Sequence, residues 1–415
     1  MSHARTGAAA AAMSNGSVLV TGGVDAAGAV SATAEIFGPS GTFAAVAPMN
    51  VARTGHTATW LAAGSGGYVL VTGGTTAGGA LAASAELYDP AANSWTLLPA
   101  PASTGAVATS LPNSSLVLSG GTGSAGLLSD LQRFDLATQQ FSFAGALPLA
   151  RKSHAACALH DGRVLIAGGV DAYGNTLASI EIYDPVAGTI SPGPALNTPR
   201  ANATATTLLD GTVLIAGGSY AEGAAANGNI AELNSAEIFD PAAGTIVLSA
   251  SPLSQGRAGH QAFLLPNNNN VLLVGGSYNG TDLASSELYT PWLGQFAATG
   301  AMSTARASAT GAALFPMADG QLLVAGGSNQ SSAELYGFAT VETDQSDYAP
   351  GTPVIISGSG WQPGESVNLF MQAIPDTANV SPLITTTLPP RRMRAATSST
   401  APGRRTKPTS AHAST

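Results

Sequence analysis

The chain has 415 residues, only 9% of them charged, with 50 glycines and 25 prolines. This composition favours short strands joined by tight turns, and the length allows several domains or one large all-β unit. No run of 18 apolar residues is present, so the sequence predicts no membrane span. A single cysteine, Cys157, excludes an internal disulfide and a cysteine-based zinc site.

Acidic and basic residues are distributed unevenly along the chain. The net charge is −9, but residues 391–415 contain six basic residues and no acidic ones. Residues 1–390 therefore hold 9 basic against 24 acidic residues, a net charge of −15. Because such a body repels phosphates and anionic lipid surfaces, we expect neither nucleic acid nor a membrane as a partner.

A Gly-Gly pair ends an apolar run seven times, at steps of 51, 47, 48, 49, 58 and 51 residues. The first glycines of these pairs are Gly22, Gly73, Gly120, Gly168, Gly217, Gly275 and Gly326. A regular spacing of about 50 residues is typical of a repeat architecture.

Each repeat contains four apolar segments separated by turns. In the fourth repeat they are Arg151–Leu159, Val164–Gly169, Ile180–Pro185 and Thr189–Pro194, and an Asp-Gly turn separates the first two. Asp-Gly is a preferred sequence for two-residue hairpins. Four short strands per repeat and seven repeats predict an all-β chain that forms a β-propeller of seven blades.

The segments "GRVLIAGG" and "EIYDP" of the fourth repeat resemble the kelch repeat, in the form found in bacterial secreted proteins and in the central domain of galactose oxidase. The resemblance covers residues 1–337 and implies a monomeric seven-bladed kelch-type propeller, located outside the cell or at its surface. The chain shows no signal peptide of its own, since "GAAAAAM" aligns with the first strand of the second repeat. Residues 1–5 align with residues 302–306, so we expect a closing blade of three strands.

Comparison of the repeats with one another identifies two recurring charges. Six repeats begin with arginine and carry glutamate at the start of the third strand, whereas the third repeat has Thr104 and Gln132 at these places. The arginines are Arg5, Arg53, Arg151, Arg200, Arg257 and Arg306, and the glutamates are Glu35, Glu86, Glu181, Glu237, Glu287 and Glu334. Because one repeat lacks both charges, we predict a buried structural ion pair in each of the other six. Six symmetric copies argue against a unique catalytic site, so we expect no catalytic residues and, more generally, no enzyme.

Histidine follows the arginine by three positions in the second, fourth and sixth repeats, as His56, His154 and His260. First strands line the channel of a propeller, so these imidazoles could converge on one copper or zinc ion. Packing between blades is the alternative that we favour, and we expect no cofactor. The copper site of galactose oxidase is not carried over, because it needs a cysteine cross-linked to tyrosine and Cys157 lies within a repeat strand, where we expect it in the core.

The loop between the second and third strands is longest in the fifth repeat, where it contributes Tyr220, Glu222 and Asn229. Variable loops on a rigid scaffold commonly carry binding functions, although this insertion could also be merely tolerated. We therefore expect a non-catalytic binding or scaffold module that recognises protein or carbohydrate through this loop face. The alternatives are a degenerate galactose-oxidase-like propeller with a metal in its channel, and a gene fragment without activity.

The chain changes character after the last repeat. Residues 341–388 contain the alternating pairs Val354 and Ile356, then Val367 and Leu369, and are similar to part of a bacterial immunoglobulin-like domain. Residues 389–415 are rich in Arg, Pro, Ala, Ser and Thr without periodicity, so we expect a disordered basic tail.

Overall fold

The computed structural model describes residues 1–64, 66–221, 230–265, 269–314, 321–328, 330–337, 340–343, 354–359 and 409–413. They belong to two compact units. The first contains Met1–Leu265, Asn269–Met317 and Gln321–Tyr336, and the second contains Gly337–Thr415 with two short segments of the preceding chain.

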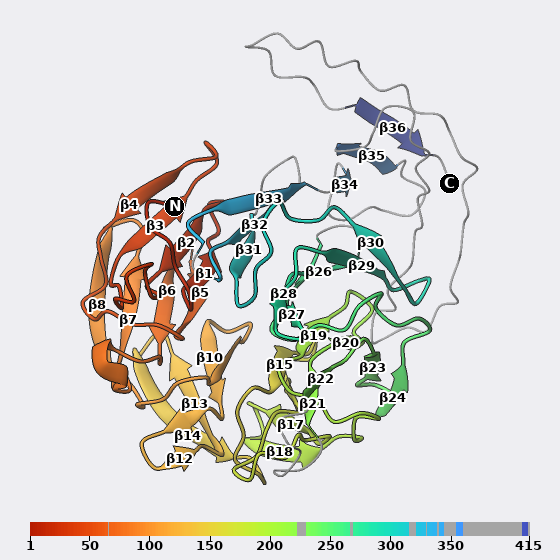
Figure 1. The fold of residues 1–415 in the computed structure, drawn as a ribbon, viewed down its shortest axis with the longest axis horizontal. Coiled ribbons are helices and arrows are strands. Elements are labelled where there is room, and N and C mark those ends of the chain that lie inside the picture. The colour runs from red at the N-terminus through yellow and green to blue at the C-terminus, as the bar shows by residue number, and fades with distance from the viewer. Residues whose placement is uncertain are drawn as a thin grey trace. The chain divides into compact units, whose positions relative to one another are not determined.

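Six antiparallel four-stranded sheets make up most of the first unit, and we call them blades 1 to 6 (Figure 1). Blade 1 consists of β1 (Ala9–Ala12), β2 (Val18–Thr21), β3 (Ala34–Phe37) and β4 (Phe43–Val46); blade 2 of β5 (Thr57–Ala63), β6 (Gly66–Thr72), β7 (Ser84–Asp89) and β8 (Ser94–Pro99); blade 3 of β9 (Val107–Ser110), β10 (Ser115–Ser119), β13 (Asp130–Asp135) and β14 (Gln140–Ala146). Blade 4 consists of β15 (Ala155–Ala158), β16 (Val164–Ala167), β17 (Ile180–Asp184) and β18 (Thr189–Pro192); blade 5 of β19 (Thr204–Thr207), β20 (Val213–Ala216), β23 (Ala236–Asp240) and β24 (Thr245–Leu248); blade 6 of β25 (Gln261–Leu264), β26 (Val271–Val274), β29 (Ser286–Thr290) and β30 (Gln295–Thr299).

The seventh repeat forms a sheet of three strands, as expected for the closing blade, so the prediction of seven blades is corrected to six complete ones. Its strands β31 (Thr310–Leu314), β32 (Gln321–Ala325) and β33 (Ala333–Gly337) form a three-stranded sheet. The next described strand, β34 (Thr340–Thr343), pairs with β35 (Val354–Ser359), and no described strand pairs with the other edge of β33. This three-stranded sheet lies between blade 6 and blade 1, because β31 neighbours both β25 and β1.

The second strand of each blade is buried on both faces, which explains its unbroken apolar sequence. All four residues of β16 and of β20, both with the sequence VLIA, are buried. One core cluster joins Leu165 and Ile180 of blade 4 to Val213, Ile215 and Phe239 of blade 5. Burial of each such side chain contributes about 1.5–3 kcal/mol, so the repeated VLIA reflects a repeated packing environment.

The Gly-Gly pairs tie each repeat to the next one. Gly168 has a φ of 66°, and a Cβ at this position would lie 2.2 Å from the carbonyl oxygen of Arg200. Gly169 donates its N–H to the same oxygen at 2.9 Å, and equivalent bonds join five other junctions. One of them, from Gly327 to the Arg5 carbonyl at 3.1 Å, closes the ring. Glycine is needed here for both the left-handed backbone and the close approach.

Aromatic residues two positions after the third-strand glutamates stabilise the outer part of the blades. Tyr88 contacts Trp95 across β7 and β8 with ring centroids 4.8 Å apart, and Phe134 contacts Phe141 across β13 and β14 at 4.9 Å. Tyr88 also packs against residues of blade 1. Such pairs add about 0.5–1.5 kcal/mol beyond the area that they bury.

In the second unit, β34, β35 and β36 (Thr409–Ala413) form an antiparallel three-stranded sheet. Val354 and Ile356 lie in a strand, whereas Val367 and Leu369 are outside the described residues, as is most of the immunoglobulin-like segment. Within the predicted tail, Thr409–Ala413 pair with β35, and the other residues of the tail are outside the described residues. Within the described residues the only helical element is a single 3₁₀ turn at Ala77–Gly79, and no helix is long and apolar enough to cross a membrane.

Candidate functional site

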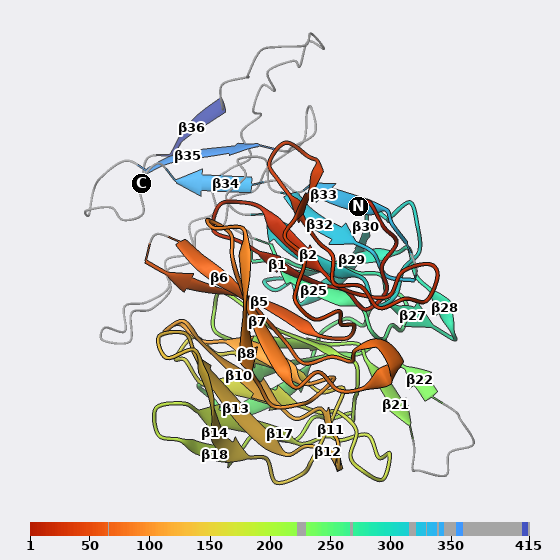
Figure 2. The same ribbon diagram turned by 90° about the vertical axis from the view of Figure 1, so that its left-hand side faces the viewer.

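One face of the propeller carries the loops between second and third strands and the linkers between repeats, and we call it the loop face. Figure 2 shows three of its hairpins on one side of the propeller. They are β11–β12 (Thr122–Gly123 and Gly126–Leu127) in blade 3, β21–β22 (Ser219–Ala221 and Ile230–Glu232) in blade 5, and β27–β28 (Ser277–Tyr278 and Thr281–Asp282) in blade 6.

A layer of arginine–glutamate pairs lies beneath the loop face. The structure brings together all six pairs expected from the repeats, with Nη2–Oε distances of 2.6–3.0 Å. In blade 5, Arg200 also donates to the carbonyl oxygens of Gly217 at 2.8 Å and Ser235 at 3.1 Å. Burial lowers the pKa of Arg200, while Glu237 opposes this shift. Each arginine thus joins the end of the second strand to the start of the third.

The linker before each arginine supplies further donors to the glutamate. Glu237 accepts hydrogen bonds from the backbone N–H and the side-chain amide of Asn197, at 2.7 and 2.9 Å. Burial alone would raise the pKa of Glu35, but hydrogen bonds from Ser2 and Arg5 outweigh it and lower that pKa. Blade 4 is different, because Pro148 occupies the place of Asn197 and has no N–H. Glu181 Oε2 accordingly has no hydrogen-bond partner among the described residues.

The third repeat places other residues in this layer, and the structure corrects the alignment of Thr104. Thr104 pairs with Thr122 as Thr54 pairs with Thr75, so Thr104 follows the arginine position. Ser103 stands in the arginine position, and its carbonyl lies 3.0 Å from a Cβ placed on Gly73. Gln132 does hold the glutamate position, opposite Leu118. The sequence already indicated this position, since Ser103 precedes Gly120 by 17 residues, as Arg200 precedes Gly217.

The three histidines lie in separate blade junctions and do not converge. His56 bonds to Thr21 at 2.9 Å, His154 to Ser119 at 2.7 Å and His260 to Thr204 at 3.0 Å, each through Nε2. Burial, reinforced by the nearest arginine, lowers the pKa of each to about 3. We call them the junction histidines. No cluster of three metal-ligating side chains occurs within the part of the chain that the structure describes, so the arrangement does not favour a channel metal.

A general base must titrate near the working pH, and neutral imidazoles with a pKa of about 3 do not meet this requirement. Cys157 packs against the core of blades 4 and 5, and burial raises its pKa to about 11. A thiol with such a pKa is a poor nucleophile. The buried polar layer therefore has the chemistry of a scaffold.

Hydroxyl groups that pair with the junction histidines were missed by sequence reasoning. Thr21 and Ser119 directly precede a Gly-Gly pair, and each faces a histidine of the next repeat. Where the next repeat has alanine at the histidine position, the residue before Gly-Gly is apolar, namely Ala167, Val274 or Ala325. Thr72 is the exception, because Ala106 faces it and its buried Oγ1 has no hydrogen-bond partner among the described residues. Comparing these two positions across repeats was the signal that could have found the pairs.

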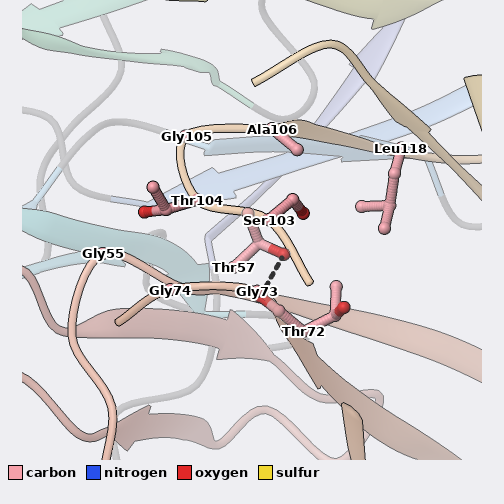
Figure 3. Close-up of a pocket in the computed structure, with 10 residues that line it drawn as sticks. All are labelled: Gly55, Thr57, Thr72, Gly73, Gly74, Ser103, Thr104, Gly105, Ala106 and Leu118. Atoms are coloured by element: carbon pink, nitrogen blue, oxygen red, sulfur yellow. Dashed lines mark hydrogen bonds between the residues drawn. The ribbon is translucent and has the colours of Figure 1, made fainter. Parts of the chain in front are cut away.

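A small cavity occupies this exceptional junction between blades 2 and 3 (Figure 3). Its lining includes Thr72, Ser103, Ala106 and Leu118, and its volume of about 10 Å³ is close to what one water molecule needs. A hydrogen bond from Thr57 Oγ1 to the Thr72 carbonyl, at 3.5 Å, crosses its edge. The cavity thus lies where the third repeat lacks both arginine and histidine.

Above the buried layer, neighbouring loops of blades 4, 5 and 6 are linked by hydrogen bonds and carry tyrosines. Tyr173 is 79% exposed, whereas Tyr220 and Tyr278 are partly buried. Thr176 Oγ1 accepts from the N–H of Ala221 at 3.1 Å, and Asn279 donates to Glu232 at 3.3 Å. We call Tyr173, Tyr220 and Tyr278 with these loops the tyrosine rim.

Of the three ligand-binding residues predicted in the fifth repeat, Tyr220 lies in the rim. Glu222 and Asn229 lie outside the described residues. Tyr173 and Tyr278 were not singled out from the sequence, although both lie in the equivalent loop of adjacent repeats.

Comparisons with known proteins identify the motif and the fold. The Kelch motif family matches residues 151–196, which run from the arginine of blade 4 into the following linker. The chain is similar to the solved structure of YjhT, with a TM-score of 0.57 and 20% sequence identity over 72% of this chain and 98% of that one. Chains of solved structures that match number 533, so the fold is too widely shared to specify a function. No curated protein matches the sequence.

Proposed function

Because the chain is a β-propeller that contains a kelch motif, we propose that it is a non-catalytic binding module that recognises a protein partner through its loop face. The observation that carries this proposal is the tyrosine rim. Tyrosine is enriched at the centre of protein interfaces, because its ring contributes contact area while its hydroxyl remains hydrogen-bonded.

The rim is held rigidly, which favours binding. Hydrogen bonds between neighbouring loops, such as Thr176 with Ala221, fix the loops before a partner arrives. Prior ordering reduces the entropy lost on association. The buried ion pairs and the Gly-Gly junctions beneath hold the blades that carry these loops, so the polar layer supports the rim.

Charge favours a basic partner. The rim loops contain Asp171, Glu232 and Asp282, and residues 1–390 carry a net charge of −15. Such a field steers positively charged partners and accelerates their association at low salt. We also propose, from the kelch resemblance, that the protein is a monomer that acts outside the cell, which cell fractionation and sedimentation test directly.

The test screens the full chain against arrays of basic peptides and of glycans, and compares two variants. One variant changes Tyr173, Tyr220 and Tyr278 to alanine, and the other changes Val186 and Trp292, which are 96% and 50% exposed in loops of the opposite face. We expect peptide binding that falls in the rim variant, persists in the opposite-face variant and weakens with salt. Binding to glycans alone would favour a carbohydrate ligand, and binding that survives in the rim variant but not in the control would overturn the choice of face.

A further inference from the structure

Blade 3 lacks the arginine found in its six counterparts but retains the acceptors that surround it. In five of those counterparts the guanidinium contacts a serine hydroxyl two residues before the glutamate, as Arg200 contacts Ser235 at 3.3 Å. In all six, Nη1 contacts the carbonyl of the first glycine, at 2.7–3.3 Å. Guanidinium binding by this layer is therefore repeated six times within the same molecule.

The equivalent acceptors of blade 3 are the Gly120 carbonyl, Asp130 and Gln132. Asp130 replaces the serine, so a carboxylate stands where Ser235 contacts Arg200. Both Asp130 and Gln132 are partly exposed, and neither side chain makes a hydrogen bond or ion pair with the residues that the structure describes. Blade 3 thus lacks the resident cation but carries an acid that its sibling blades do not have.

The arginine position of this junction is held by a smaller side chain. Ser103 is much shorter than arginine, and it lines the cavity together with Ala106 and Leu118. Leu118 lies opposite Gln132 in the β10–β13 register, so both side chains point to the same side of the sheet, towards blade 2. In the described chain, the N–H of Gly74 makes no bond to the Ser103 carbonyl, unlike the six other junctions. The cavity therefore adjoins the side of the sheet that carries the unused acceptors.

We propose that blade 3 binds the guanidinium group of an arginine side chain supplied by the partner. The inference rests on the proposed function, since it specifies the chemistry of the basic partner at the loop face. The planar fork of arginine matches a carboxylate and two carbonyl-type oxygens, as the resident arginines do, whereas the lysine ammonium is a point charge. Asp130 supplies the charge, and Gln132 and the Gly120 carbonyl orient the fork.

The experiment uses a fluorescent glycine-rich peptide with one arginine, and two matched peptides with lysine or neutral citrulline. We expect the arginine peptide to bind the full chain about tenfold more tightly than the citrulline peptide, since citrulline keeps the planar shape of the side chain but carries no charge. Lysine should bind with intermediate affinity. Equal affinity for arginine and citrulline would overturn the proposal.

Three variants locate the site. Asp130→Ser restores the residue of the sibling blades and should abolish the preference for arginine without lowering the melting temperature. Ser103→Arg fills the position from within, so it should also abolish binding and raise the melting temperature. Asp25→Asn removes an acid from a loop of blade 1 on the same face and should leave binding unchanged. Equal losses in Asp130→Ser and Asp25→Asn would show attraction to net charge alone, which also overturns the proposal.

The two proposals fail separately. Substitution of the rim tyrosines affects the partner interface but leaves Asp130 in place. Arginine-peptide binding that persists in the rim variant supports the blade 3 site, independently of the result of the array test for the tyrosine rim. Array binding that survives in the rim variant but is lost in the opposite-face variant overturns only the proposed face.

Discussion

The buried pair of Arg200 and Glu237 allows the role of the polar layer to be measured. Their side chains are 1% and 0% exposed, and Arg200 Nη2 lies 2.6 Å from Glu237 Oε1. Arg200→Ser leaves Glu237 buried with donors only from the linker, and Glu237→Gln leaves the guanidinium without its counter-charge. Breaking a buried pair on one side costs about 3–5 kcal/mol, so each single variant should lose that much stability.

The double variant Arg200→Ser/Glu237→Gln copies the serine and glutamine of blade 3. We expect it to be more stable than the sum of the single losses predicts, by about 0.5–3 kcal/mol, because it leaves no unpaired charge. The assay is urea unfolding followed by circular dichroism, with the midpoint and slope reported for each variant. Arg163→Ser is the matched control, since the Arg163–Asp161 pair is equally short at 2.7 Å but exposed, and should cost about 0–1 kcal/mol.

If the losses of stability in the two single variants add up to the loss in the double variant, the reasoning is refuted, because the two charges then do not depend on each other. A loss in Arg200→Ser no larger than that of the control would refute it as well. In that case the coupling between arginine and glutamate would not explain why blade 3 lacks both charges.

Further predictions concern the remaining parts of the polar layer and the core. The junction histidines have a pKa of about 3 in the folded chain, below the value of 6.5 expected in the unfolded chain, so the unfolded chain binds more protons below pH 6.5. The histidine contribution to stability should therefore be fully present above pH 6.5 and decrease as the pH falls. The expected decrease in the free energy of unfolding is about 2 kcal/mol per histidine between pH 8 and pH 5. Urea unfolding over that range checks it, and a triple His→Gln variant should flatten the curve. Pro148→Asn should stabilise the chain by about 1 kcal/mol, because it supplies an N–H to Glu181 Oε2; an unchanged urea midpoint would contradict this. Ala106→His should raise the midpoint at pH 8 by giving Thr72 Oγ1 a partner, and a lower midpoint would show that the cavity is too small. Cys157 should react with iodoacetamide only in urea; rapid labelling of the folded chain would show that its thiol is not protected.

Features set by the repeat period could be predicted from the sequence. The first glycine of each Gly-Gly pair lies close to a carbonyl oxygen of the following repeat. Because this close approach is needed in every repeat, the pairs recur with the repeat period and indicated a propeller. Likewise, the arginine and glutamate that vary together were recognised as partners before their contact was known. Repetition provides an internal comparison, in which a residue that changes in one copy reveals what it contacts.

Features of a single junction could not be predicted in this way. The isolation of each junction histidine, for example, depends on the distance between blades. Strand β36 is a further case, because the pairing of Thr409–Ala413 with β35 joins segments far apart in the chain and follows no local pattern.

The sequence by itself therefore determined the four-stranded repeat, the apolar second strands and the identity of the buried charge partners, because all of these follow from local periodicity. Only the tertiary structure decided which side chains meet between blades. It placed Tyr173, Tyr220 and Tyr278 on linked loops, and among the described residues it gives Asp130 no cation and β33 no second neighbouring strand. The physical reason is that contacts between blades depend on how neighbouring sheets pack, and the loops that carry them vary in length from one repeat to the next.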